Sequence, residues 1–188
     1  MPPETNGNNK YVWYVGYGSN LFRKRFLCYI EGGQFELGGS NSRGCKDKTL
    51  PMKDKHIHIP YALYFAKNAR TWDNQGVAFI STERDESKQT YGRMWKVTEN
   101  QFSEICEQEG EWYNVEVDLG QDEYGIPIRT ITNGVQLMPN KPSDKYLRTM
   151  ILGLRETFRL DNESILRYLM EKRGIKGKMT QTEIIALF

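Results

Sequence analysis

Blocks of apolar and polar residues alternate along the chain and predict a run of strands followed by helices. Tyr11 to Val15 is apolar on both faces of an extended segment, as in a strand at the centre of a sheet. Because a regular strand–helix–strand alternation is missing, the order of elements favours an α+β fold, with a mixed or curled sheet and helices packed outside it. Further strands are expected over 56–66, 76–81, 90–97, 112–119 and 127–137, and helices over 21–30, 98–108, 146–158 and 165–170.

The chain is predicted to form one domain with three less regular segments. Its 188 residues are typical of a single domain. Residues 1–9 are rich in Pro, Asn and Gly and are expected to form a disordered tail, which leaves 10–188 for the domain. Glycines interrupt 32–55, which predicts a long loop or insertion, and 159–188 is expected to form a C-terminal helical extension.

Composition and charge restrict the cellular compartment and the binding partners that the sequence predicts. There are 26 Lys and Arg against 24 Asp and Glu, so a net charge of +2 gives no electrostatic case for binding nucleic acid or an acidic membrane surface. No apolar run approaches the ~20 residues of a membrane span, and the polar first residues do not resemble a secretory signal. The cysteines, Cys28, Cys45 and Cys106, lack ligand-like spacing and favour a reducing, cytoplasmic setting.

The residue types used for metal and thiol chemistry are scarce. His56 and His58 are the only histidines, and their spacing places both on one face of a strand, most simply at its surface. Two histidines are too few for a zinc-dependent deacetylase of the arginase-like kind, which needs paired histidines beside its metal ligands. Cys106 has no histidine partner in the pattern and is expected to pack in the core.

The first candidate site is the segment Tyr17-Gly18-Ser19-Asn20-Leu21, which follows the buried strand and opens a helix. Backbone N–H groups at a glycine-rich turn before a helix bind anions such as carboxylates or phosphates. The same residues also suit a purely structural turn in which Ser19 or Asn20 caps the helix. The spacing of the glycines matches neither a dinucleotide fingerprint nor a phosphate P-loop, and Leu21 replaces a glycine that a nucleophile elbow needs.

The second candidate is Glu109, near the end of the helix expected over 98–108. At about 100° per residue it falls within roughly 20° of Phe102 on the helical wheel, whereas Glu104 and Glu107 point outward. Desolvation and the helix dipole both raise the pKa of an inward carboxylate in a last helical turn. Such a group can take and return a proton at neutral pH. The alternative is a surface glutamate on a helix that frays before reaching it.

Basic residues occur in two further places. Arg43 and Lys46, in the glycine-rich segment, are candidates for contacting a substrate carboxylate. The cluster Arg23, Lys24 and Arg25 lies in the early turns of the first helix and is typical of a solvated helix face.

The run Tyr14-Val15-Gly16-Tyr17-Gly18-Ser19-Asn20-Leu21 resembles the signature of the γ-glutamyl cyclotransferase-like (AIG2-like) superfamily. The resemblance extends over roughly residues 11 to 155, and only this run and the Glu-Gly helix end are specific. It implies a small mixed β-barrel ringed by helices, in agreement with the α+β fold expected from the pattern. The other matching segments, in order, are Trp72, Gly76-Val77-Ala78, Gly92, Glu107-Gln108-Glu109-Gly110, Tyr113 and Pro142–Leu154 with Tyr146.

The activity that the resemblance implies is intramolecular aminolysis. The α-amine of a γ-glutamyl group attacks its own γ-carbonyl and releases 5-oxoproline and an amine. Glu109 would be the general acid and base, and the partner would be a small γ-glutamyl molecule, with neither a metal nor an organic cofactor. The residues that would bind this substrate are Tyr17, Gly18, Ser19, Asn20, Leu21 and Tyr113.

Two features depart from the family pattern. The glycine-rich segment 32–55 is longer than in compact members, as expected for a lid or a specificity loop, and Ile131 stands where some members carry a tyrosine. These departures leave open a non-catalytic module that binds a small carboxylate- or amine-bearing ligand in the same pocket. A protein–protein interaction domain, the third possibility, would present a large exposed apolar patch.

Overall fold

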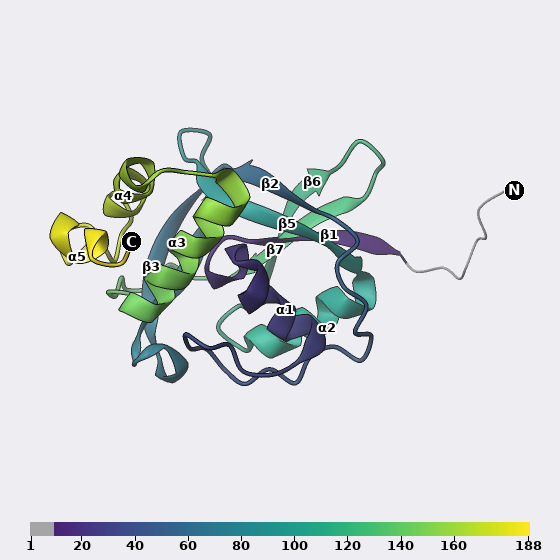
Figure 1. Cartoon of the computed structure of the whole chain (residues 1–188). Helices are drawn as coiled ribbons and strands as arrows, with labels where there is room; N and C mark the ends of the chain where they lie inside the picture. The colour runs from purple at the N-terminus through teal and green to yellow at the C-terminus, as the bar shows by residue number, and fades with distance from the viewer. Residues whose placement is uncertain (1–9) are drawn as a thin grey trace, which may run out of the picture.

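The computed structural model describes residues 10–188 and shows a five-stranded mixed sheet, a two-stranded ribbon and helices packed around them (Figure 1). This arrangement confirms the predicted α+β fold; the tail predicted over residues 1–9 lies outside the described residues. The strands are β1 (Tyr11–Gly16), β2 (Asp54–Ile59), β3 (Tyr61–Ala69), β4 (Gln75–Arg84), β5 (Thr90–Thr98), β6 (Val115–Gln121) and β7 (Pro127–Thr132). The α-helices are α1 (Arg23–Glu31), α2 (Glu99–Glu109), α3 (Asp144–Phe158), α4 (Asn162–Met170) and α5 (Gln181–Ile185), with 3-10 turns η1 (Ser19–Leu21) and η2 (Arg70–Trp72).

Strand β1 is the centre of the sheet, as its sequence predicts. The strand order is β2-β5-β1-β7-β6, with β1 antiparallel to β5 and parallel to β7. Val12 and Val15 are fully buried, and Trp13 and Tyr14 are 2% and 3% exposed. Because β1 is covered on both faces, the turn that follows it begins deep inside the molecule.

The single strand expected over 56–66 is in fact two strands that belong to different sheets. Pro60 separates them: β2 pairs with β5 in the main sheet, and β3 pairs with β4 in the ribbon. Proline has no N–H to donate to a strand ladder, so it interrupts one. Residues 85–89 connect the ribbon strand β4 to the sheet strand β5, so these two consecutive strands do not pair with each other.

Thr132, the last residue of β7, joins the sheet to the ribbon. Its hydroxyl accepts the N–H of Ile80 at 3.2 Å and donates to the carbonyl of Ile80 at 2.6 Å. The Thr132 side chain is fully buried, so its hydroxyl provides hydrogen bonds to two backbone groups of β4 that water does not reach. The strands expected over 112–119 and 127–137 are shorter at one end, beginning at Val115 and ending at Thr132.

Helices α2 and α3 begin at side-chain caps. The Ser143 hydroxyl accepts the Tyr146 N–H at the start of α3, and Thr98 forms a reciprocal capping box with Gln101 at the start of α2. In Figure 1, α3 crosses the front of the sheet, and α4 and α5 lie beside it. Ile165 of α4 and Ile184 of α5 are fully buried in the core that α3 also covers, so the C-terminal segment packs on the same core.

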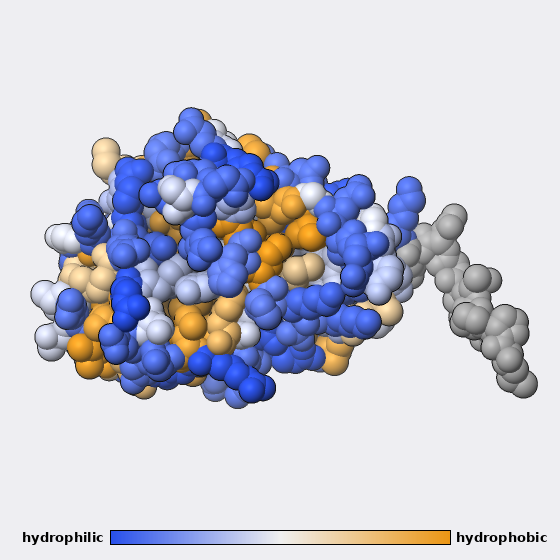
Figure 2. Space-filling model, turned by 90° about the horizontal axis from the view of Figure 1, so that it is seen from above, coloured by the Kyte–Doolittle hydropathy of each residue, from blue (hydrophilic) through white to orange (hydrophobic). Residues whose placement is uncertain are grey.

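The surface seen from above is largely hydrophilic, with apolar side chains showing in gaps between polar ones (Figure 2). Isolated exposed apolar side chains of this kind are normal on soluble folds. Within the described residues, no helix combines the length and the hydropathy needed to cross a membrane. The large apolar side chains that are exposed come from several separate segments: Leu50, Met52, Trp112, Tyr124, Val135, Met138 and Ile185.

Candidate active site

The turn after β1 is rigid and buried. A Cβ on Gly16 would lie 2.7 Å from the Cβ of Asn20, so the chain can fold back this tightly only with glycine at that position. The indole N–H of Trp95 donates to the carbonyl of Asn20 at 3.1 Å. Ser19 is 9% exposed and Asn20 is 4% exposed. The Tyr-Gly-Ser-Asn turn is therefore fixed inside the molecule.

Helix α2 brings Glu109 to this turn. The capping box at Thr98 fixes its start, and the buried side chains of Phe102 and Ile105 fix its inward face. Glu109 is the last helical residue and lies on that face, as the helical wheel predicts, before Gly110 ends the helix with φ of +80°. The alternative of a surface glutamate beyond a frayed helix end is therefore wrong.

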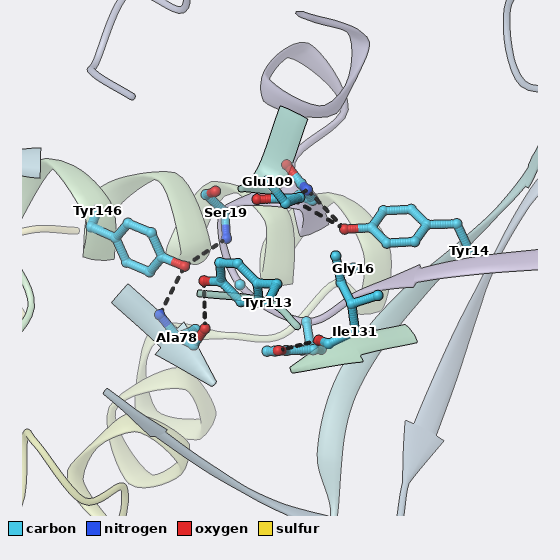
Figure 3. A pocket seen from close by; sticks show the side chains of 11 residues that line it. Tyr14, Gly16, Ser19, Ala78, Glu109, Tyr113, Ile131 and Tyr146 are labelled. Atoms are coloured by element: carbon cyan, nitrogen blue, oxygen red, sulfur yellow. Dashed lines mark hydrogen bonds between the residues drawn. The ribbon is translucent and has the colours of Figure 1, made fainter. Parts of the chain in front are cut away.

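Three side chains donate hydrogen bonds to the Glu109 carboxylate, and Figure 3 shows the Tyr14 hydroxyl pointing toward it. The Asn20 amide donates to Oε1 at 2.7 Å, and the Tyr14 hydroxyl donates to the same oxygen at 3.3 Å. The Tyr29 hydroxyl, from α1, donates to Oε2 at 3.0 Å. The two segments singled out in the sequence thus meet at one place.

Burial sets the proton affinity of this cluster. It raises the pKa of Glu109 above its ordinary value, because desolvation disfavours the carboxylate; the charge of Arg25 and the bond from Tyr29 oppose this effect in part. Burial also raises the pKa of Tyr14 and of Tyr29 well above the ordinary range. Both hydroxyls therefore keep their protons at neutral pH and act as donors to Glu109.

A small cavity of about 30 Å³ opens beside the cluster. Tyr113 forms one wall, and its hydroxyl donates to the carbonyl of Ala78 at 2.8 Å. The hydroxyl of Tyr17 donates to the carbonyl of Ile131 at 2.7 Å. The lining residues are Tyr14, Gly16, Tyr17, Gly18, Ser19, Asn20, Ala78, Glu109, Tyr113, Ile131 and Tyr146.

The hydroxyl group of Tyr146, from α3, lies at the wall of this cavity and is bound by two backbone N–H groups. Its hydroxyl oxygen accepts the backbone N–H of Ser19 at 3.4 Å and that of Ala78 at 3.1 Å. Burial raises the pKa of Tyr146 to about 12, so the hydroxyl keeps its own hydrogen. With both lone pairs engaged, that hydrogen is free to donate into the cavity. Only one of these two N–H groups, that of Ser19, belongs to the Tyr-Gly-Ser-Asn turn, so the anion site expected at the turn stays a prediction.

A second cavity of about 100 Å³ adjoins the first, and Ser19, Glu109, Tyr113 and Tyr146 line both. Arg25 also lines it. The prediction that the cluster 23–25 forms a solvated face is wrong for Arg25, which is only 2% exposed. Helix α1 turns this residue inward together with Phe26.

Three other predicted contacts lie elsewhere. Leu21 is fully buried in the core, where its Cβ abuts Gly153, and it lines neither cavity. Arg43 pairs with Glu107 at the surface, and the backbone N–H of Lys46 donates to Glu104. The long loop therefore does not bring Arg43 or Lys46 to the cavities.

Tyr14, Arg25, Tyr29 and Tyr146 are functional candidates that sequence reasoning did not assign to the site. Arg25 and Tyr29 are four residues apart, so a helix places them on one face, and this spacing was an available signal. Tyr14 and Tyr146 stand in segments that carry the family resemblance, but both occur in apolar patterns that core packing explains equally well.

The histidines and thiols lie apart from the site. His56 and His58 lie on β2, with their rings 5.5 Å and 5.3 Å from that of Phe158. Cys106 is partly buried against the core under α2. Across residues 10–188 no three His, Cys, Asp or Glu side chains gather as a metal site would require.

The sheet, ribbon and helices together form the fold of γ-glutamyl cyclotransferases. A solved γ-glutamyl cyclotransferase superposes with a TM-score of 0.60 and 20% identity, covering 95% of this chain and 98% of that one. A crystal structure of an uncharacterized protein from Homo sapiens gives the same values. YkqA from Bacillus subtilis superposes with a TM-score of 0.52 and 15% identity, over 84% of this chain and 52% of that one.

In sequence, the chain is similar to Histone deacetylase 5 of Arabidopsis thaliana, with 28% identity over 199 residues. The alignment covers 84% of this chain and 30% of that protein, so the chain spans less than a third of the relative's length. No family model matches the chain.

Proposed function

We propose that the chain is a γ-glutamyl cyclotransferase-like enzyme that releases 5-oxoproline and an amine from a γ-glutamyl amide. The observation that carries the proposal is the Glu109 carboxylate, bound by Asn20 across 2.7 Å and facing a cavity that the Tyr-Gly-Ser-Asn turn also lines. The shared fold supports it independently.

The reaction needs two protons moved from one nitrogen to another. The α-ammonium of the substrate loses one proton, its nitrogen attacks the γ-carbonyl carbon, and a second proton leaves that nitrogen as the ring forms. The amide C–N bond then breaks, and the departing nitrogen takes up both protons and leaves as an ammonium. A single carboxylate with a raised pKa can carry these protons one at a time, and Glu109 has this property.

The remaining residues have roles that follow from their free hydrogen-bonding groups. Asn20 donates to Glu109 through its amide nitrogen, while its buried Oδ1 has no partner among the described residues and is suited to accept from the substrate ammonium. The Tyr146 hydroxyl donates to a substrate oxygen, with Ser19 and Ala78 fixing its position. Closing a five-membered ring between groups held in this way supplies much of the rate by orientation.

The small volume of the first cavity supports a second candidate function, that of a non-catalytic binding module. The first cavity, about 30 Å³, is large enough for a water molecule but smaller than a γ-glutamyl group. A substrate must therefore also occupy the adjoining cavity or displace the side chain of Tyr146. A smaller carboxylate or amine would need less rearrangement.

The experiment is a screen for 5-oxoproline release. The purified chain is incubated with γ-glutamyl amino acids, γ-glutamylamines and glutathione, and 5-oxoproline is quantified by mass spectrometry. On a compound that is cleaved, Glu109→Gln should lower kcat about 10²- to 10⁴-fold while the circular dichroism spectrum is unchanged. Glu107→Gln, an outward residue of the same helix, is the matched control and should retain activity. Full activity in Glu109→Gln would refute the proposed role, and binding without release would favour the binding module.

A further inference from the structure

A wide groove of about 750 Å³ lies between the turn 85–89 and the C-terminal segment. One wall comes from β3 and the turn that connects β4 to β5, and the other comes from α4 and the residues after it. The groove shares no lining residue with the two cavities beside Glu109. In Figure 1, α4 lies on the opposite side of the molecule from α2, which carries Glu109. The groove is therefore separate from the candidate active site.

Basic side chains outnumber acidic ones along this groove. Its carboxylates are those of Glu86, which pairs with Arg84, and of Glu171. Its basic residues are Lys88, Arg167, Lys172, Arg173 and Lys176. Arg167 is the only one of these in an ion pair within residues 10–188. Four positive charges are therefore left beside the single carboxylate of Glu171.

Lys172 is the least exposed of the four remaining cations. It is half-buried, and its Nζ lies 4.0 Å from the centre of the Tyr168 ring. Burial lowers the pKa of Lys172, and the charge of Lys88 lowers it further, although Glu171 opposes both effects. Two ammonium groups therefore lie close enough to repel one another across the groove, and an anion bound near both would stabilise them.

The wall beside these cations is apolar and fixed in place. Tyr91 of β5 and Leu160, before α4, are only partly buried and line the groove. The N–H of Tyr91 donates to the Tyr168 hydroxyl at 3.2 Å, and the two rings lie 4.5 Å apart. This contact holds β5 against α4, so the two walls keep their separation. Binding sites for small molecules have volumes of roughly 300–1,000 Å³ and combine apolar walls with a few charged groups.

We propose that this groove is a second binding site, which takes a small organic phosphate with its phosphate group near Lys88 and Lys172. A phosphate monoester carries about −1.5 to −2 charges at pH 7, so it neutralises both ammonium groups, whereas a carboxylate neutralises one. Lysine binds phosphate as a point charge. The organic half of the ligand contacts Tyr91 and Leu160. This site does not depend on the proposed cyclotransferase activity.

The test is calorimetric titration of the purified chain with phenyl phosphate, in a buffer without phosphate and at constant ionic strength. Phenyl phosphate combines a dianion with an apolar ring. Benzoate keeps the ring but carries one charge, and inorganic phosphate keeps the dianion but lacks the ring. We expect the Kd of phenyl phosphate to be lower than that of either comparison compound by about 10-fold or more.

Substitutions locate the bound phosphate. Lys88→Gln changes an exposed side chain of the turn, which leaves the fold intact, and should raise the Kd of phenyl phosphate by about 10-fold. Lys172→Gln should raise it by about 10- to 100-fold, with the fold checked by circular dichroism. The matched control is Lys178→Gln, an exposed lysine of the same segment that does not line the groove and should keep the wild-type Kd.

The proposal is overturned if phenyl phosphate shows no saturable binding, or if its Kd is unchanged in Lys88→Gln and Lys172→Gln. An equal rise in Lys178→Gln would show general attraction to a basic surface in place of a site. Benzoate binding as tightly as phenyl phosphate would reject the dianion, and inorganic phosphate doing so would reject the organic half. A Kd that rises in Glu109→Gln and stays unchanged in Lys172→Gln would assign the phosphate to the candidate active site.

Discussion

The side-chain amide of Asn20 donates a hydrogen bond of 2.7 Å to Oε1 of Glu109, although 89 positions separate the two residues in the chain. Asn20 is held by the turn after the central strand, and Glu109 is held by the last turn of α2. Neither residue can approach the other unless both elements are in place. The proposed proton-transfer group is therefore positioned by the fold as a whole.

Removing the Asn20 amide should alter the acidity of Glu109. The hydrogen bond from Asn20 lowers the pKa of this partly buried carboxyl, so Asn20→Ala should raise that pKa further. Glu109 must be ionised to accept the first proton, and the acid limb of the kcat/KM profile should move to higher pH. The measurement is a pH–rate profile of 5-oxoproline release, with Glu107→Gln as a control. An unmoved acid limb would show that another group controls it.

Tyr146→Phe should impair both stability and catalysis. The loss of the hydroxyl leaves the backbone N–H groups of Ser19 and Ala78 without their acceptor, which destabilises the fold by about 1–3 kcal/mol. Release of 5-oxoproline should also fall by about 10- to 100-fold, because a donor to the substrate oxygen is lost. Urea unfolding and steady-state kinetics measure the two effects. An unchanged kcat/KM would exclude Tyr146 from substrate binding.

The stability of the protein should depend on the protonation of Glu109. Its pKa is raised above the ordinary value of 4.5, so the folded state favours the neutral acid. This contribution is complete below the unfolded-state pKa and disappears as the pH rises through the folded-state pKa. The melting temperature of the wild type relative to Glu109→Gln should therefore rise as the pH falls from 7 toward 4.5. A difference that is constant over this range would contradict the raised pKa.

The junction between sheet and ribbon offers a test of the fold alone. Thr132→Val keeps the shape of the side chain but leaves the N–H and the carbonyl of Ile80 without their partner. The expected loss of unfolding free energy is about 2–4 kcal/mol, measured in urea. Thr130→Val is the matched control, because the Thr130 hydroxyl donates to a single carbonyl, that of Val15, and its loss should be smaller. Equal losses of unfolding free energy in the two variants would show that the two hydrogen bonds of Thr132 contribute no more to stability than the single bond of Thr130.

The parts of the fold that depend on local patterns could be predicted from the sequence. The central strand is apolar on both faces, and the capping pair of Thr98 and Gln101 identifies the start of α2. Helical periodicity predicts the inward direction of Glu109, although it left open a helix that frays before this residue. These features could be predicted because each depends on residues within a few positions of one another.

The parts that depend on distant contacts could not be predicted in the same way. Three consecutive basic residues suggest a solvated face, yet the phase of α1 turns Arg25 inward, toward Tyr29 and a loop of glycines. The division of the strand at Pro60 assigns its two halves to different sheets, which pairing partners far along the chain decide. The place of Tyr146 at the site likewise depends on α3 packing over the first turn of the chain.

The segment between α1 and β2 contains an isolated bridge from Gly33 to Ser42 but no strand or helix, and it encloses Arg25 through Gly39 and Ser40. A change in its length or sequence would reshape the wall of the second cavity and leave the strand ladders and Glu109 in place. Under the proposed function, such changes would alter the choice of substrate and leave the proposed general acid and base in place.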